Sequence, residues 1–147
     1  LSEAVYLALV AIGFHCDIPN EESTAAKAED FVISHHEWDG WSASVEVKGF
    51  KATGAKVVHA VKLSKRRDRR GTAQGLLIVN SECARDPASR HLPFSNNEDS
   101  RDSVRELGVL VLDTRELYQV LTSSRPKEAL LEAIQSGSGV YESEDDG

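Results

Sequence analysis

The sequence SVEVK, which ends at Lys48, places a carboxylate and an ammonium two residues apart in an otherwise apolar run. Because successive side chains of a strand point to opposite faces, Glu46 and Lys48 are expected on one face and Val45 and Val47 on the other. The two charged groups then lie about 7 Å apart along the chain. A carboxylate joined by a second carboxylate can bind a divalent cation, and a neighbouring lysine can position a water or stabilise charge on a phosphate.

A metal site of this kind needs a second acidic ligand. Asp30 opens the strand-like run DFVIS, which is expected to pair with residues 41–49 through a hairpin turn at Asp39-Gly40. That pairing would bring Asp30 and Glu46 to the same end of the sheet. Asp39 is an alternative ligand, although its place in the turn favours a structural role. An ordinary ion pair, or solvent-facing charges, would also explain Glu46 and Lys48.

Hydrophobic patterning predicts helices and strands in an order that can position these residues. Helices are expected at 2–12, 55–70, 100–107, 114–121 and 126–137, and strands at 14–18, 30–34, 41–49, 76–80 and 109–113. Ser2 and Thr114 are the expected N-caps of their helices. A meander of three strands followed by two crossover units implies an α/β fold of three α/β/α layers with a mixed central sheet.

Residues 1–136 are expected to form one domain. The acidic residues 137–147 are expected to form a disordered tail. The two cysteines, Cys16 and Cys83, have no motif spacing and indicate a reducing, cytoplasmic setting. No apolar run approaches the roughly 20 residues that span a bilayer, so no membrane partner is expected. The chain contains no methionine, which favours a domain of a longer protein or a processed product.

The formal net charge of −7 at first disfavours a nucleic-acid partner, but the charge is unevenly distributed. Acids gather at residues 21–22, 29–30, 98–99 and 142–146, whereas a basic run occupies one expected helix: Lys62, Lys65, Arg66, Arg67, Arg69 and Arg70. A polyanion responds to such a local field rather than to the net charge. The same run also fits a solvated helix C-terminus, where cations complement the helix dipole.

Asp30 followed by Glu46-x-Lys48 at the end of an apolar strand resembles the motif of the PD-(D/E)xK nuclease superfamily. Over residues 1–80 the expected elements follow the order of its restriction-endonuclease-like core: a helix, a three-stranded meander that carries the motif, a crossover helix and a further strand. The segments LLIVNSECARDPASRHLPF and VLVLDTRELYQVL also resemble bacterial nuclease-like domains, over roughly residues 1–123. In place of the family's Pro-Asp, this chain has Glu29-Asp30.

The resemblance implies a metal-dependent endonuclease domain that hydrolyses DNA phosphodiester bonds, as a module of a larger bacterial protein. Asp30, Glu46 and Lys48 would be the catalytic residues. Asp30 and Glu46 would bind Mg²⁺ or Mn²⁺ together with the backbone carbonyl of Val47. Glu3 occupies the place of an extra helical ligand found in some members, although an acid there also suits a helix N-terminus.

The resemblance further implies phosphate contacts from the basic run and from Arg85 and Arg90 in the long polar loop 81–97. Asn80 would support the site from the end of its strand. Two other functions stay open from the sequence. One is a nuclease-like domain without catalysis that binds nucleic acid or a protein partner. The other is an interaction module that forms a homodimer through helices 114–121 and 126–137.

Overall fold

The structure is a computed structural model that describes residues 1–17, 30–50, 55–82, 84–95 and 97–143. These residues form an α/β fold around one mixed sheet. Its strands lie in chain order: β1 (His15–Asp17), β2 (Asp30–Ser34), β3 (Ser42–Gly49), β4 (Gln74–Asn80), β5 (Val109–Asp113) and β6 (Gly139–Val140). The helices are α1 (Ser2–Ala11), α2 (Val57–Arg70), α3 (Glu98–Glu106), α4 (Thr114–Leu121) and α5 (Glu128–Ser136).

The sheet has an antiparallel half and a parallel half, as the order of elements predicts. β1, β2 and β3 form the expected meander, and β3 to β6 run parallel to one another. In the antiparallel half, Asp30 is paired directly with Glu46. In the parallel half, Lys48 is paired with Val79 and Gly49 with Asn80. The segment that carries the acid and the amine is therefore the central strand between the two halves.

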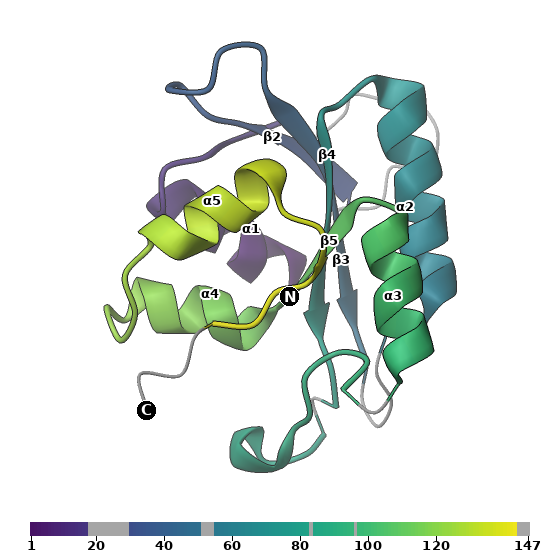
Figure 1. Ribbon diagram of the computed structural model, residues 1–147. Coiled ribbons are helices and arrows are strands. Elements are labelled where there is room, and N and C mark those ends of the chain that lie inside the picture. The colour runs from purple at the N-terminus through teal and green to yellow at the C-terminus, as the bar shows by residue number, and fades with distance from the viewer. Residues whose placement is uncertain (18–29, 51–54, 83, 96, 144–147) are drawn as a thin grey trace.

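Helices cover both faces of the sheet. Figure 1 shows α1, α4 and α5 on one side and α2 and α3 on the other. Consecutive residues of β4 pack into different cores: Ile78 joins the core beneath α1, α4 and α5, whereas Leu77 and Val79 join the core beneath α2 and α3. Because β4 is buried on both faces, its sequence reads as a continuous apolar run.

The helix α2 lies against β3 and β4 through Ala60 and Leu63, both of which are fully buried. Burying a leucine side chain contributes about 2–3 kcal/mol, so these contacts fix the helix on the sheet. The helix ends at Gly71, whose φ of 69° is the left-handed conformation that glycine adopts without strain. The basic run thus lies in a helix whose inner face is anchored in the core.

Both expected N-caps are wrong by one residue. The N-cap of α1 is Leu1 rather than Ser2, and that of α4 is Asp113 rather than Thr114. The Asp113 carboxylate accepts a hydrogen bond from the backbone N–H of Arg115 at 2.9 Å. Two adjacent residues that can both cap a helix leave its start ambiguous in the sequence.

The expected tail is also wrong for the residues just after 136. Gly139–Val140 pairs with β5 as the last strand, and Tyr141 donates its backbone N–H to Val111 O at 2.8 Å. Residues 144–147 of that expected tail lie outside the described part of the chain. The domain therefore extends past the boundary that composition predicts.

The structure describes one of the two cysteines, and its helices bear on the expectation about the membrane. Cys16 is buried, and burial is the main reason why the pKa of its thiol is raised to about 11. Cys83 lies outside the described residues. Among the helices that the structure describes, none has the length and apolar character that crossing a bilayer requires.

Candidate active site

Glu46 and Lys48 lie side by side on β3, as strand alternation predicts. Lys48 Nζ is 3.4 Å from Glu46 Oε1, and the side chains are 26% and 10% exposed, respectively. Their partners in β4, Leu77 and Val79, belong to the core beneath α2. The pair therefore lies on the α2 face of the sheet, between strand and helix.

Arg66 of α2 approaches the same carboxylate from above the sheet. Its Nη1 lies 3.5 Å from Glu46 Oε2, so the carboxylate faces two cations. The separation exceeds that of a hydrogen bond, and within the described part of the chain the buried Glu46 Oε2 has no hydrogen-bond donor. A buried acceptor is costly in a folded protein unless a charge compensates it, and here the Arg66 guanidinium does so. A metal ion that binds this oxygen must therefore displace Arg66.

His59, two turns before Arg66, lies near this pair. Its pKa is lowered, first by burial and then by the Lys48 ammonium, although the Glu46 carboxylate opposes the shift. The backbone N–H of Lys56 donates to His59 Nδ1 at 3.1 Å. Since Nδ1 is an acceptor, the neutral ring carries its proton on Nε2. His59 therefore offers a neutral N–H donor next to Lys48.

The carboxylate of Glu46 suits a hard cation, although one described carboxylate is not a complete set of ligands. Mg²⁺ binds oxygen atoms, commonly one or two carboxylates plus waters, and Glu46 Oε2 supplies one such atom. The register pairs Asp30 with Glu46, although the side chain of Asp30 lies outside the described part of the structure. Within the described ranges, no three His, Cys, Asp or Glu side chains gather to hold a metal ion. A cation site here would therefore depend on Glu46 and Asp30.

The other expected ligands have different positions. Val47 is paired with Ile78, and its side chain packs in the opposite core. The part of Val47 that could join Glu46 as a metal ligand is therefore its backbone carbonyl. Glu3 is exposed on α1, which covers the face opposite to Glu46. Contrary to the expectation, the structure does not bring Glu3 to the carboxylate pair, because strand alternation sends Glu46 towards α2.

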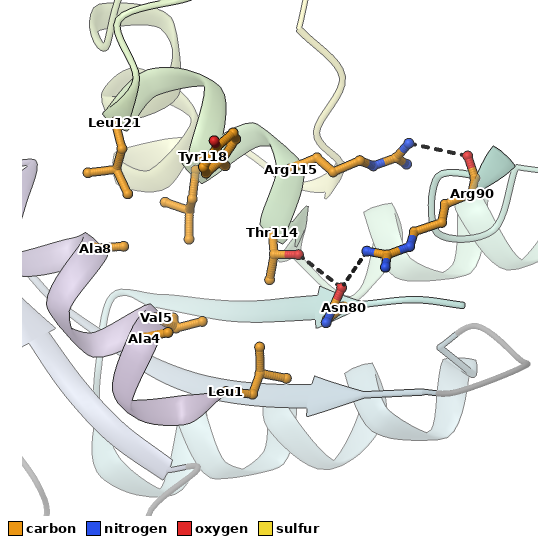
Figure 2. A pocket seen from close by; sticks show the side chains of 11 residues that line it. Leu1, Ala4, Val5, Ala8, Asn80, Arg90, Thr114, Arg115, Tyr118 and Leu121 are labelled. Carbon is orange, nitrogen blue, oxygen red and sulfur yellow. Dashed lines mark hydrogen bonds between the residues drawn. The ribbon is translucent and has the colours of Figure 1, made fainter. Parts of the chain in front are cut away.

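Asn80 also lies on the opposite face, in a groove of about 540 Å³ between α1 and α4. Figure 2 shows its Oδ1 between Thr114 and Arg90: the Thr114 hydroxyl donates at 3.3 Å and Arg90 Nη1 at 3.4 Å. The structure does not bring Asn80 to Glu46, contrary to the expectation. Arg90 likewise lines this groove rather than the α2 face. Arg85 is exposed, with Nη1 3.9 Å from Glu82 Oε1.

The basic run of α2 divides into cations with different roles. His59, Arg66 and Arg70 lie seven and four residues apart, which places them on one flank of the helix beside β3. Lys62 borders this flank, since its charge also lowers the pKa of His59. Lys62 is exposed, as are Lys65 and Arg69. Arg66 contacts Glu46, and the exposed cations of the same helix add positive charge that suits phosphates.

Arg67 is the exception within this run, because its guanidinium points into the protein. Nη1 donates to the carbonyls of Leu107 at 3.0 Å and Gly108 at 3.1 Å, and Nη2 donates to the Ser64 hydroxyl at 3.1 Å. These bonds tie the end of α2 to the turn between α3 and β5. The expected role of Arg67 in binding phosphate is therefore replaced by a structural one.

His59 and the contact of Arg66 with Glu46 were not predicted from the sequence. The spacing of seven residues between His59 and Arg66 is a signal that both lie on one helical face. That spacing does not say which strand the face meets, so the contact appears only in three dimensions.

In comparisons with known proteins, no family model, no curated protein and no solved structure matches this chain.

Proposed function

We propose that this chain is a metal-dependent nuclease domain, with a restriction-endonuclease-like fold, that hydrolyses phosphodiester bonds of DNA. The observation that carries the proposal is the pairing of Glu46 and Lys48 at 3.4 Å on one sheet face, with Asp30 opposite Glu46 in the ladder. The order of helices and strands is also the order that the nuclease resemblance implies. Cations of α2 border the pair, which supports a polyanionic substrate.

The residues of this chain have distinct tasks under the proposal. Asp30 and Glu46 would hold Mg²⁺ or Mn²⁺, with the Val47 carbonyl as a further oxygen. When bound, such an ion polarises a phosphate oxygen and lowers the pKa of a bound water. Lys48 supplies an ammonium that stabilises negative charge developing on the phosphate.

The helix α2 contributes to holding the substrate. Lys62 and Lys65 are exposed and can neutralise phosphates on either side of the scissile bond. His59 offers Nε2–H as a neutral donor to a phosphate oxygen near Lys48. Arg66 must move away from Glu46 Oε2 when a cation takes that oxygen, and in its new position its guanidinium would donate to the phosphate.

One observation favours a second function, a domain of the same fold that binds nucleic acid without cutting it. Arg66 already neutralises the Glu46 carboxylate at 3.5 Å, which is the task that a metal ion would perform. If this ion pair is permanent, the acid and the amines serve to fix α2 on β3. The exposed cations of α2 would still contact phosphates.

A cleavage assay separates the two functions. Supercoiled and linear DNA are incubated with the protein and Mn²⁺ or Mg²⁺, and the variants Asp30→Asn, Glu46→Gln and Lys48→Ala are compared with the unchanged chain. Each variant is expected to lose about 100-fold or more of the cleavage rate. Glu106→Gln, on the exposed surface of α3, is the matched control and should cleave normally. Binding without cleavage by the unchanged chain would support the second function and contradict the first.

A further inference from the structure

A polar cavity lies next to the candidate active site, at the carboxyl end of the parallel strands. It has a volume of about 530 Å³ and lies between the N-terminal end of α2 and the loop that follows β4. Its lining includes Lys56, Val57, Ser81, His91 and Asn97, and we call it the Ser81 pocket. In open α/β sheets, ligands bind in crevices at this end of the strands.

The Ser81 pocket is on the same face of the sheet as Lys48. Val79 is the partner of Lys48 in the parallel ladder, and Ser81 follows it two residues later. Two residues of extended chain span about 7 Å. His59, which senses the Lys48 charge, is in the first turn of α2, next to Lys56 and Val57 of the pocket lining. The pocket is therefore a close neighbour of the Glu46–Lys48 pair.

The hydroxyl of Ser81 is a buried polar group in the lining of the pocket. Ser81 is 3% exposed, and its Oγ is buried with no hydrogen-bond partner among the residues that the structure describes. A hydroxyl can donate one hydrogen bond, and leaving it unsatisfied in the interior is unfavourable. An acceptor that enters the pocket would satisfy this donor.

The rest of the lining favours an anionic acceptor. The first amides of α2 have no carbonyl within the helix to accept them, and they carry the positive end of its dipole. The exposed Lys56 immediately precedes them. Asn97, the N-cap of α3, also lines the pocket, but its side chain already accepts the Ser100 N–H, and Glu98 and Asp99 follow in the first turn of α3. The N-terminus of α2, an ammonium and an unsatisfied hydroxyl together match a phosphate group.

Glu82 is the acidic group of the same lining, and it is engaged by the loop. Its Oε2 accepts the backbone N–H of His91 at 2.7 Å, and the His91 ring Nδ1 lies 3.2 Å from Oε1. These two hydrogen bonds lower the pKa of the Glu82 carboxyl, so it is charged at neutral pH. The carboxylate should therefore weaken the binding of an anion in the pocket. Removing its charge by substitution should strengthen that binding.

We propose that the Ser81 pocket binds a phosphate group of the nucleic-acid strand, adjacent to the phosphate held at Glu46 and Lys48. The proposal rests on the proposed function for the identity of the strand, but phosphate binding can be measured without cleavage. The pocket would fix the register of the strand along β3 and α2, so that one particular phosphodiester reaches the Glu46–Lys48 pair.

The first experiment measures the affinity for a short fluorescein-labelled DNA duplex by anisotropy, in EDTA and at several salt concentrations. Ser81→Ala should weaken binding about fivefold without changing the salt dependence, because a neutral donor is lost. Lys56→Gln should weaken binding and reduce the slope of log affinity against log salt by about one. Glu82→Gln should tighten binding. Lys127→Gln, an exposed lysine before α5, is the control and should change neither quantity.

The second experiment titrates inorganic phosphate into the ¹⁵N-labelled chain. The amide signals of Val57, Val58 and Ser81 should shift, and Ser81→Ala with Lys56→Gln should abolish the shifts. If DNA binds but these variants keep the affinity and the salt slope, and phosphate shifts none of these amides, the pocket proposal is overturned while the nuclease proposal stands. If the unchanged chain binds no DNA, the nucleic-acid part of both proposals is overturned, whatever inorganic phosphate does.

Discussion

Replacing Glu46 by glutamine tests whether the carboxylate is held by the two cations beside it. The substitution keeps the size of the side chain and removes its charge. Lys48 at 3.4 Å and Arg66 at 3.5 Å are then left facing a neutral amide. Because the Glu46 side chain is only 10% exposed, solvent cannot fully replace the lost partner.

The expected loss of stability follows from the burial of the three groups. One ion pair at this separation has a Coulomb energy of about 5 kcal/mol at an effective dielectric constant of 20, before desolvation is counted. Measured losses run from under about 1 kcal/mol for exposed pairs to about 3–5 kcal/mol for buried ones. Here the cations are about one quarter exposed, so we expect a loss of about 2 kcal/mol. For a domain of this size that lowers Tm by about 4–8 °C.

The assay is thermal unfolding followed by circular dichroism in metal-free buffer. Glu106→Gln, on the exposed surface of α3, should stay within about 0.5 kcal/mol of the unchanged chain. The double variant Glu46→Gln/Arg66→Gln should lose about 1 kcal/mol less than the sum of the single variants, because the two side chains are coupled. A Tm of Glu46→Gln that equals or exceeds that of the unchanged chain would refute the assignment of these cations to the carboxylate.

Three further predictions concern His59, Cys16 and Arg67. Because the pKa of His59 is lowered in the folded state, the unfolded state binds more protons between that pKa and about 6.5. The free energy of unfolding, measured by urea titration, should therefore rise with pH over this range. The variant His59→Gln should flatten the rise. Cys16, with a pKa near 11, should resist alkylation at pH 8 in the native state and react on unfolding, as peptide mass spectrometry would show; rapid native alkylation would contradict its burial. Arg67→Met should lower stability by about 2 kcal/mol in thermal unfolding and leave the DNA affinity, measured by anisotropy, unchanged. Lys65→Met should leave stability unchanged and weaken DNA binding. The opposite pattern would contradict the structural role of Arg67.

The sequence was informative wherever a periodic pattern fixes the structure. Alternation places Glu46 and Lys48 on one face of β3, and the short distance between them confirms this. The continuous apolar runs of β4 and β5 predicted strands that are covered on both sides, and both are buried. The order of elements from α1 to α5 is also as predicted.

The parts that could not be predicted depend on how the layers meet. Glu46 and Val45 are both buried, so the sequence does not reveal which of them faces α2. For that reason the positions of Glu3 and Asn80, on the opposite side, were not foreseen. The strand β6 has only Gly139 and Val140, too short to show a pattern, and its neighbours have the composition of a tail.

The most direct test of the central claim is a crystal structure of this chain grown with MnCl₂, with an anomalous map collected for manganese. We expect a peak about 2.1 Å from a Glu46 carboxylate oxygen, with Asp30 as the second acidic ligand and the Arg66 guanidinium displaced. A map without a peak at saturating Mn²⁺, with Arg66 still in contact with Glu46, would show that the carboxylate belongs to an ion pair and not to a metal centre.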